Sequence, residues 1–149
     1  MATKNIAELA LEFGRSMAEM KNYLRQHIQV KIREHNLNIT FELLKIMSLL
    51  QRKDGVNQQE LADTTAKDKS TMTYLIDNLV KLNLVTRVER DIDRRNKLIF
   101  LTGEGKLLQK KLHPLVIEMY DKATAEVNAG KIEKAILLVK RMNENLKTK

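Results

Sequence analysis

Apolar residues recur every three or four positions along most of the chain, and this spacing predicts amphipathic helices. The longest stretch runs from Asn5 to about Arg33 and carries one apolar stripe, made of Ile6, Leu9, Ala10, Phe13, Met17, Met20, Leu24 and Ile28. That stripe is longer than one small domain usually needs to cover its own core. The polar run from His35 to Asn38 ends this predicted helix.

Three polar residues are suited to cap the next helices, because a side-chain oxygen can accept a hydrogen bond from a free backbone N–H of the first turn. The predicted caps and helices are Thr40 before residues 41–51, Asn57 before a short helix through Asp63, and Asp68 before residues 69–82. Glu60 follows Asn57 at the spacing of a capping box. Asn83 is placed to end the helix that Asp68 begins.

The pattern changes between residues 84 and 102, where two stretches favour β-strands. They are Leu84–Arg90 and Lys97–Thr102, and the polar segment Asp91–Asn96 separates them. Two short strands around a polar loop predict a β-hairpin. The loop is longer than a tight turn requires, which suggests that it has a function of its own.

Two more helices are predicted towards the C-terminus. The first begins at Thr102–Gly105 and contains Pro114, which predicts a kink or a break because proline cannot donate a backbone hydrogen bond. Ala129–Gly130 is predicted to separate it from the last helix. The apolar positions of that helix are Ile132, Ile136, Leu137, Val139 and Met142.

The order helix, helix, short helix, helix, hairpin is that of a winged helix-turn-helix. We therefore predict a mainly α fold with a small β-hairpin. In such a fold the helix 69–82 enters the major groove of duplex DNA and the hairpin forms the wing. If Met72 lies at the centre of the buried face of this helix, the side chains expected on its outward face are Ser70, Thr73, Tyr74, Asp77 and Lys81.

Composition narrows the class of protein further. The chain has 149 residues, which suits one compact domain, and its formal net charge of +8 favours anionic partners such as nucleic acid or an acidic membrane surface. The absence of cysteine excludes disulfides and thiolate metal sites. No apolar run approaches the roughly 20 residues of a membrane span, and the first residues lack the apolar stretch of a secretory signal. We therefore expect a cytoplasmic protein.

The basic residues are distributed unevenly. Lys131–Lys149 holds six basic and two acidic residues, and Asn83–Lys97 holds five and three. Asn57–Leu82, which includes the predicted DNA-reading helix, has a net charge of −1. If DNA is the partner, the middle helices supply shape and hydrogen bonds, and the charge comes from elsewhere in the chain.

Five short motifs follow one another in the central part of the sequence. They are Gln59–Ala62, Asp68–Thr73, Leu84–Arg87, Asp93–Arg95 and Leu101–Thr102. In order and spacing they resemble the MarR family of winged helix-turn-helix transcription regulators. The resemblance implies a single domain over residues 1–149, with a DNA-binding lobe at about 38–102 and dimerisation helices at about 5–35 and 103–147.

The resemblance also implies which residues contact DNA. The recognition helix is expected to read the major groove through Lys69, Ser70, Thr71, Thr73 and Tyr74. Arg95 is expected to enter the minor groove and Arg94 to lie near the backbone, while Asp93 orients the wing arginine through an ion pair. Gln58 is a candidate phosphate contact.

The sequence departs from the family pattern at two positions. Tyr74 stands where many relatives carry arginine, which puts its type of contact in doubt. Asn83 replaces the usual glycine before the first strand, and asparagine can satisfy a left-handed backbone there.

Family membership would imply a homodimer that binds a pseudo-palindromic site in double-stranded DNA. The resemblance implies a repressor that a small aromatic or anionic effector releases. No cofactor, no metal and no membrane partner are expected, and the chain is not expected to be an enzyme.

Other classes of function have weaker support. The sequence has no Gly-rich phosphate loop and neither the H-E-x-x-H nor the G-x-S-x-G motif of common hydrolases. His27, His35 and His113 do not form a dense cluster at metal-ligand spacing. Two alternatives stay open: a winged-helix module for protein–protein contact and a non-specific DNA binder.

Overall fold

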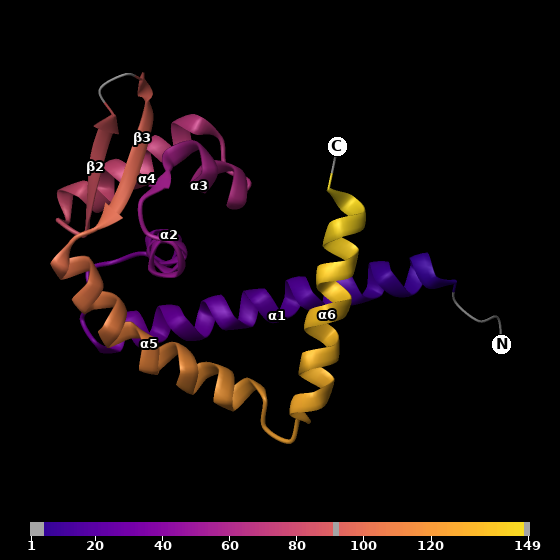
Figure 1. Cartoon of the computed structure of the whole chain (residues 1–149). Coiled ribbons are helices and arrows are strands. Elements are labelled where there is room, and N and C mark those ends of the chain that lie inside the picture. Colours follow the sequence, from indigo (N-terminus) through magenta and orange to yellow (C-terminus); the bar gives the residue numbers. More distant parts are fainter. Residues whose placement is uncertain (1–4, 91–92, 148–149) are drawn as a thin grey trace. The chain divides into compact units, whose positions relative to one another are not determined.

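The computed structural model describes residues 5–90 and 93–147, and side chains throughout these ranges except at residues 90 and 93–96. The described residues form six helices and a small sheet, which confirms the predicted mainly α fold (Figure 1). In chain order the elements are α1 (Ile6–Glu34), α2 (Phe41–Arg52), β1 (Val56–Asn57), α3 (Gln58–Thr64), α4 (Lys69–Lys81), β2 (Val85–Arg90), β3 (Asp93–Leu101), α5 (Gly103–Ala123) and α6 (Ala129–Leu146).

The chain divides into two compact units, and the boundary between Val116 and Ile117 lies inside α5. The first unit contains α1 to α4, the sheet and the first part of α5. The second contains the end of α5 and α6. The limits of the DNA-binding lobe and of the dimerisation helices within one domain over residues 1–149 stay a prediction.

The core of the first unit is aliphatic and is centred on α2, α4 and β3. Seven of its side chains are completely buried: Ile46, Met47, Leu50, Met72, Ile76, Leu79 and Ile99. Met72 is among them, at the predicted centre of the buried face of α4. Burial of these faces provides the main favourable free energy for folding, because helices this short are marginal in water on their own.

The three predicted N-caps are confirmed by hydrogen bonds. Thr40 Oγ1 accepts from the Leu43 N–H at 3.3 Å, Asn57 Oδ1 from the Gln59 N–H at 2.7 Å, and Asp68 Oδ1 from the Thr71 N–H at 2.7 Å. The start of α2, α3 and α4 is therefore set by short-range chemistry that is visible in the sequence.

The sheet has three antiparallel strands in the order β1-β3-β2. Val85 pairs with Leu101 at the base of the β2–β3 hairpin, and the two-residue strand β1 adds Val56 opposite Ile99. The sequence predicted the hairpin but not β1, because two residues are too few to show an alternating pattern.

The expected loop Asp91–Asn96 is wrong in its length, because β3 already begins at Asp93 and Arg90 pairs with Asp93 across the hairpin. Backbone pairing with β2 makes residues 93–96 a strand. Their polar composition hid this in the sequence, because a strand is recognised by alternating apolar and polar residues.

Of the kink or break predicted at Pro114, the break does not occur, because α5 runs without interruption from Gly103 to Ala123. Proline removes one backbone donor, but the hydrogen bonds of the neighbouring turns remain and Leu112 is 1% exposed, which anchors this part of the helix.

The separator expected at Ala129–Gly130 lies instead in the first turn of α6. Asn128 Oδ1 caps this helix by accepting from the Gly130 N–H at 2.7 Å and the Lys131 N–H at 3.3 Å. The turn before it includes Glu126, whose φ of 63° is left-handed. No helix in the described part of the chain is long and apolar enough to cross a membrane.

Candidate nucleic-acid interface

Helix α4 presents a row of small polar side chains at its exposed N-terminal end. Its buried face consists of Met72, Leu75, Ile76 and Leu79. On the other side Lys69, Ser70 and Thr71 are exposed, and 66% of Tyr74 is exposed. An N-terminus with unpaired N–H groups and a partial positive charge attracts phosphate, and short polar side chains fit against base edges.

The cap of α4 is ionic. Hydrogen bonds from Thr71, helped by the nearby Lys67 ammonium, hold the pKa of Asp68 below its usual value. Asp68 is therefore ionised at neutral pH, and its carboxylate complements the positive end of the helix dipole.

The side chain of Gln58 connects the short helix α3 to α4, the predicted recognition helix, through a hydrogen bond. Its Nε2 donates to Thr73 Oγ1 at 2.9 Å, and the Thr73 hydroxyl donates to the Lys69 carbonyl at 2.9 Å. The structure thus brings together three of the predicted contact residues. Gln58 Oε1 is buried and has no hydrogen-bond partner in the described residues. The phosphate contact predicted for Gln58 stays a prediction, and it would share this amide with Thr73.

Asp77 and Arg87 connect the recognition helix to the wing. Arg87 Nη2 lies 2.7 Å from Asp77 Oδ1, and the Arg87 side chain is 21% exposed. The sequence placed Asp77 on the outward face of α4 but did not identify this partner. Ten residues and a change of secondary structure separate the two, so no sequence pattern marks the pair.

The wing itself is the β2–β3 hairpin. Its backbone register runs from Val85 opposite Leu101 to Arg90 opposite Asp93, with an irregularity between Glu89 and Arg90. The side chains of Asp93, Arg94 and Arg95 lie outside the described residues. Their expected roles at the tip of the wing therefore stay predictions.

The end of α4 and the base of the wing are fixed by special backbone geometry. Asn83 has a left-handed φ of 59°, as expected for a residue that replaces glycine. The Asn83 N–H donates to the Val80 carbonyl at 2.9 Å and the Leu84 N–H to the Leu79 carbonyl at 3.0 Å, the arrangement that ends many helices. Thr102 Oγ1 then donates to the Asn83 carbonyl at 2.7 Å, which ties the start of α5 to the same point.

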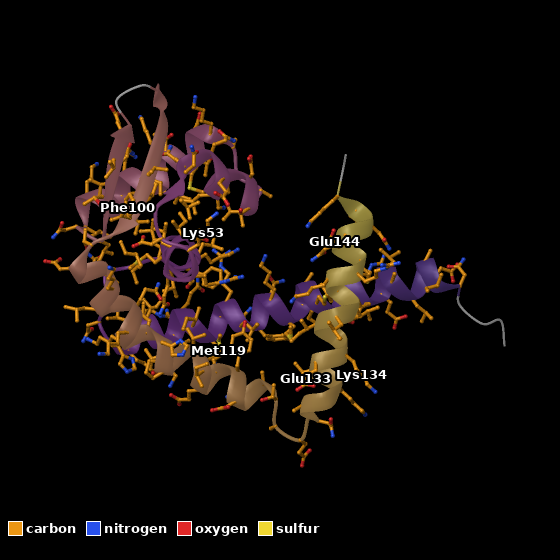
Figure 2. All side chains as sticks on the ribbon, in the orientation of Figure 1. Lys53, Phe100, Met119, Glu133, Lys134 and Glu144 are labelled. Carbon is orange, nitrogen blue, oxygen red and sulfur yellow. The ribbon has the colours of Figure 1, made fainter. Side chains whose placement is uncertain are left out.

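A second set of contacts joins β3 to the turn between α2 and β1. The Leu101 N–H donates to Asp54 Oδ1 at 2.9 Å. Gly55 has a φ of +69°, and a Cβ atom there would lie 2.7 Å from the Phe100 ring. Figure 2 labels Phe100 of β3 and Lys53, which follows α2, and Lys53 Nζ lies 3.4 Å from Glu60 Oε1 of α3.

A groove of about 710 Å³ lies beside the recognition helix within the first unit. It is lined by the end of α1, the α1–α2 turn, the start of α2 and one side of α4. Among its lining residues are Arg33, Leu43, Tyr74, Asn78 and Lys81. Tyr74 thus belongs both to the predicted DNA-reading face and to the groove.

The described residues contain no group of three or more His, Asp or Glu side chains that could hold a metal ion. A model of the MarR family matches residues 39–97, from the end of the α1–α2 turn to the middle of β3. This part of the chain is therefore similar to the MarR family.

Solved MarR structures share the fold well beyond that segment. A MarR transcriptional regulator from Methanosarcina mazei is 26% identical and superimposes with a TM-score of 0.78, over 89% of this chain and 94% of its own. A mutant MarR from Escherichia coli, solved in complex with operator DNA, is 20% identical with a TM-score of 0.75, over 93% of this chain and 99% of its own. The winged helix-turn-helix of this chain is therefore that of MarR proteins.

A curated relative is similar over a shorter segment. The HTH-type transcriptional regulator FarR of Neisseria gonorrhoeae is 33% identical over 84 residues, which is 56% of this chain and 58% of FarR. This chain thus matches less than two thirds of the length of FarR.

Proposed function

We propose that this chain is a MarR-type, sequence-specific transcription regulator that binds duplex DNA. The observation that carries the proposal is the orientation of α4: its apolar face is buried, and its opposite face exposes Lys69, Ser70, Thr71 and Tyr74. An anchored helix with such a face can enter the major groove and hydrogen-bond to base edges. The solved complex of the E. coli relative with operator DNA supports the same use of the fold.

The proposed contacts are those expected from the sequence. Lys69, Ser70, Thr71, Thr73 and Tyr74 read the major groove. Arg95, oriented by Asp93, enters the minor groove, and Arg94 and Gln58 contact the backbone. Because the segment that carries α3 and α4 has a net charge of −1, the arginines of the wing supply most of the nearby positive charge.

The functional unit is proposed to be a homodimer. Apolar side chains of α1 stay exposed in the single chain, among them Ile6, Leu9 and Met20. Helix α6, considered by itself, exposes Ile132, Ile136, Leu137 and Leu138. Exposed apolar rows of this kind are buried in homodimer interfaces.

A two-fold dimer presents two recognition helices, so the site on DNA is a pseudo-palindrome. Its half-sites are expected to lie about one helical turn, roughly 34–36 Å, apart. The regulator would act in the cytoplasm, and repression is the mode that we propose.

Control by a small ligand is the finer part of the proposal. The groove beside α4 offers about 710 Å³, enough for a small organic molecule. An occupant would touch Tyr74, Asn78 and Lys81 on the recognition helix itself. A ligand that binds more tightly when α4 is in a position that does not match the DNA groove shifts the population away from DNA binding.

Selection from a pool of random duplex DNA tests this proposed function. The purified protein is expected to enrich an inverted repeat with half-sites about one turn apart. Salt-sensitive retention without any enriched sequence would point to a non-specific DNA binder. A folded protein that retains no DNA would refute the proposal and leave the protein–protein module as the better reading.

A further inference from the structure

Tyr74 is the large side chain in the middle of the outward face of α4. Helical spacing places Ser70, Tyr74 and Lys81 opposite the buried row that contains Met72 and Leu79. The side chain of Tyr74 is 66% exposed, although most of its bulk is an aromatic ring. Within the described residues its hydroxyl has no hydrogen-bond partner. The recognition helix therefore offers DNA one large, mostly apolar side chain.

The polar side chains beside Tyr74 are already engaged within the protein. The Thr73 hydroxyl donates to a backbone carbonyl of its own helix and accepts from Gln58 Nε2, both at 2.9 Å. Asp77, the next outward residue along the helix, forms an ion pair with Arg87 at 2.7 Å. Tyr74 is thus left as the uncommitted side chain in the middle of the outward face.

The chemistry of the helix limits which base its middle can read. Guanine is read best by the forked donors of arginine, and adenine by the amide of asparagine or glutamine. Helix α4 contains no arginine or glutamine, and its one asparagine, Asn78, is half-buried.

The aromatic ring of Tyr74 selects among the bases by its apolar surface. An apolar ring placed against a polar base edge removes water from that edge without replacing its hydrogen bonds. Thymine alone presents an apolar group in the major groove, its 5-methyl group. The ring of Tyr74 therefore suits thymine better than any other base.

We propose that Tyr74 determines base specificity at one position of each half-site by packing its ring against the 5-methyl group of a thymine in the major groove. The inference rests on the proposed function, because it assigns a base to one residue of the DNA-reading helix. The polar side chains of Lys69, Ser70 and Thr71 supply hydrogen bonds at the start of α4, and Tyr74 supplies the apolar contact.

Replacement of thymine by uracil in the DNA tests the proposal, because uracil lacks only the 5-methyl group. Each thymine of the site selected from random duplex DNA is replaced in turn, and fluorescence anisotropy measures the affinity of the whole protein. At one thymine per half-site the affinity is expected to fall about fourfold, and about 15-fold when both half-sites are changed, which is the value of one buried methyl group at each.

Three variants identify the side chain responsible. Tyr74→Ala is expected to bind the unmodified site more weakly and to lose the discrimination between thymine and uracil at that position. Tyr74→Phe keeps the ring and is expected to keep the discrimination. Val80→Ala is the matched control, because Val80 is also an exposed apolar residue of α4 but lies off the row of Ser70 and Tyr74. Urea unfolding establishes that each variant is folded.

A second selection from random DNA, carried out with Tyr74→Arg, gives an independent readout. Arginine donates two hydrogen bonds to guanine, so this variant is expected to enrich guanine at the position where the wild type enriches thymine. The same enriched sequence for both proteins would overturn the proposal.

Equal affinity for thymine and uracil at every position of the selected site would also overturn it, as would a Tyr74→Ala variant that keeps the discrimination. Equal loss of affinity in Tyr74→Phe and Tyr74→Ala, with the preference for thymine intact, would assign the Tyr74 hydroxyl to a phosphate and refute the proposal. These results differ from a failure of the proposed function, in which the wild type selects no sequence at all and the inference fails with it.

Discussion

The amide of Gln58 shows how single residues of the interface serve two purposes. The Thr73 hydroxyl uses its hydrogen on the Lys69 carbonyl, so it can only accept from Gln58 Nε2. Gln58 and Thr73 were both predicted to face DNA, and the structure shows that their side chains are hydrogen-bonded to each other. The geometry of the recognition helix therefore depends on a residue of the neighbouring helix.

Replacement of Gln58 by leucine is expected to reduce the free energy of unfolding by about 1 kcal/mol, the net value of a typical hydrogen bond. Urea unfolding measures this change. Gln59→Ala is the control, because Gln59 is exposed and forms only a surface contact with Asp63. If both variants lost the same stability, the hydrogen bond to Thr73 would have no special value.

Arg95→Ala is expected to weaken binding to the selected DNA site by about 1–3 kcal/mol, the value of one good base contact. Fluorescence anisotropy with a labelled duplex measures the affinity. Lys110→Ala removes a positive charge from the exposed side of α5 and is expected to change affinity far less. An unchanged affinity in Arg95→Ala would count against the assignment of Arg95 to the minor groove.

At the scale of elements, the recognition helix is held at both ends and along one side. Asp68 fixes its start, the left-handed Asn83 fixes its end, and the Asp77–Arg87 ion pair ties it to β2. The start of α5 packs against the same region at Gly105. These attachments fix the position of α4 relative to the wing, as the proposed reading of two adjacent grooves would require.

Gly105→Ala tests this attachment. A Cβ atom at residue 105 would lie 2.2 Å from the Leu84 carbonyl oxygen, which is backbone and cannot turn away. The substitution is expected to reduce the free energy of unfolding by about 1–3 kcal/mol, as overpacking does elsewhere.

Gly103→Ala is the matched control, since a Cβ atom at residue 103 meets nothing within 4 Å. Its stability is expected to equal or exceed that of the wild type, because alanine favours helix. Equal destabilisation of the two variants in urea would show that α5 does not depend on a close approach to Leu84.

At the scale of the whole molecule, much apolar surface is left without cover in a single chain. In the second unit no residue of α6 is buried, although its apolar positions recur at helical spacing. The long stripe of α1 is likewise only partly used, with Ile28 and Ile32 buried near its C-terminal end. Dimerisation would bury both apolar surfaces, which the isolated chain leaves exposed.

Leu137→Lys is expected to shift the protein from dimer to monomer, because Leu137 is 67% exposed on the apolar side of α6 and a charge there would be buried at an interface. Sedimentation velocity measures the shift. Val88→Lys places the same charge on an exposed position of the wing and is expected to leave the dimer intact. Two variants with the dimeric mass of the wild type would exclude α6 from the interface.

The sequence by itself determined the features that depend on residues a few positions apart. The caps at Thr40, Asn57 and Asp68, the left-handed Asn83 and the buried face around Met72 all follow from local hydrogen bonds or helical spacing. The family pattern then placed the recognition helix and the wing.

Only the tertiary structure decided which distant residues meet. The Asp77–Arg87 pair and the bond from Leu101 to Asp54 across 47 residues leave no mark in the sequence. The same holds for the short strand β1 and for residues 93–96 of β3, because their pairing depends on a partner strand rather than on their own composition. The reason is physical: a local pattern fixes the conformation of a segment, while contacts between segments depend on how all of them pack into one core.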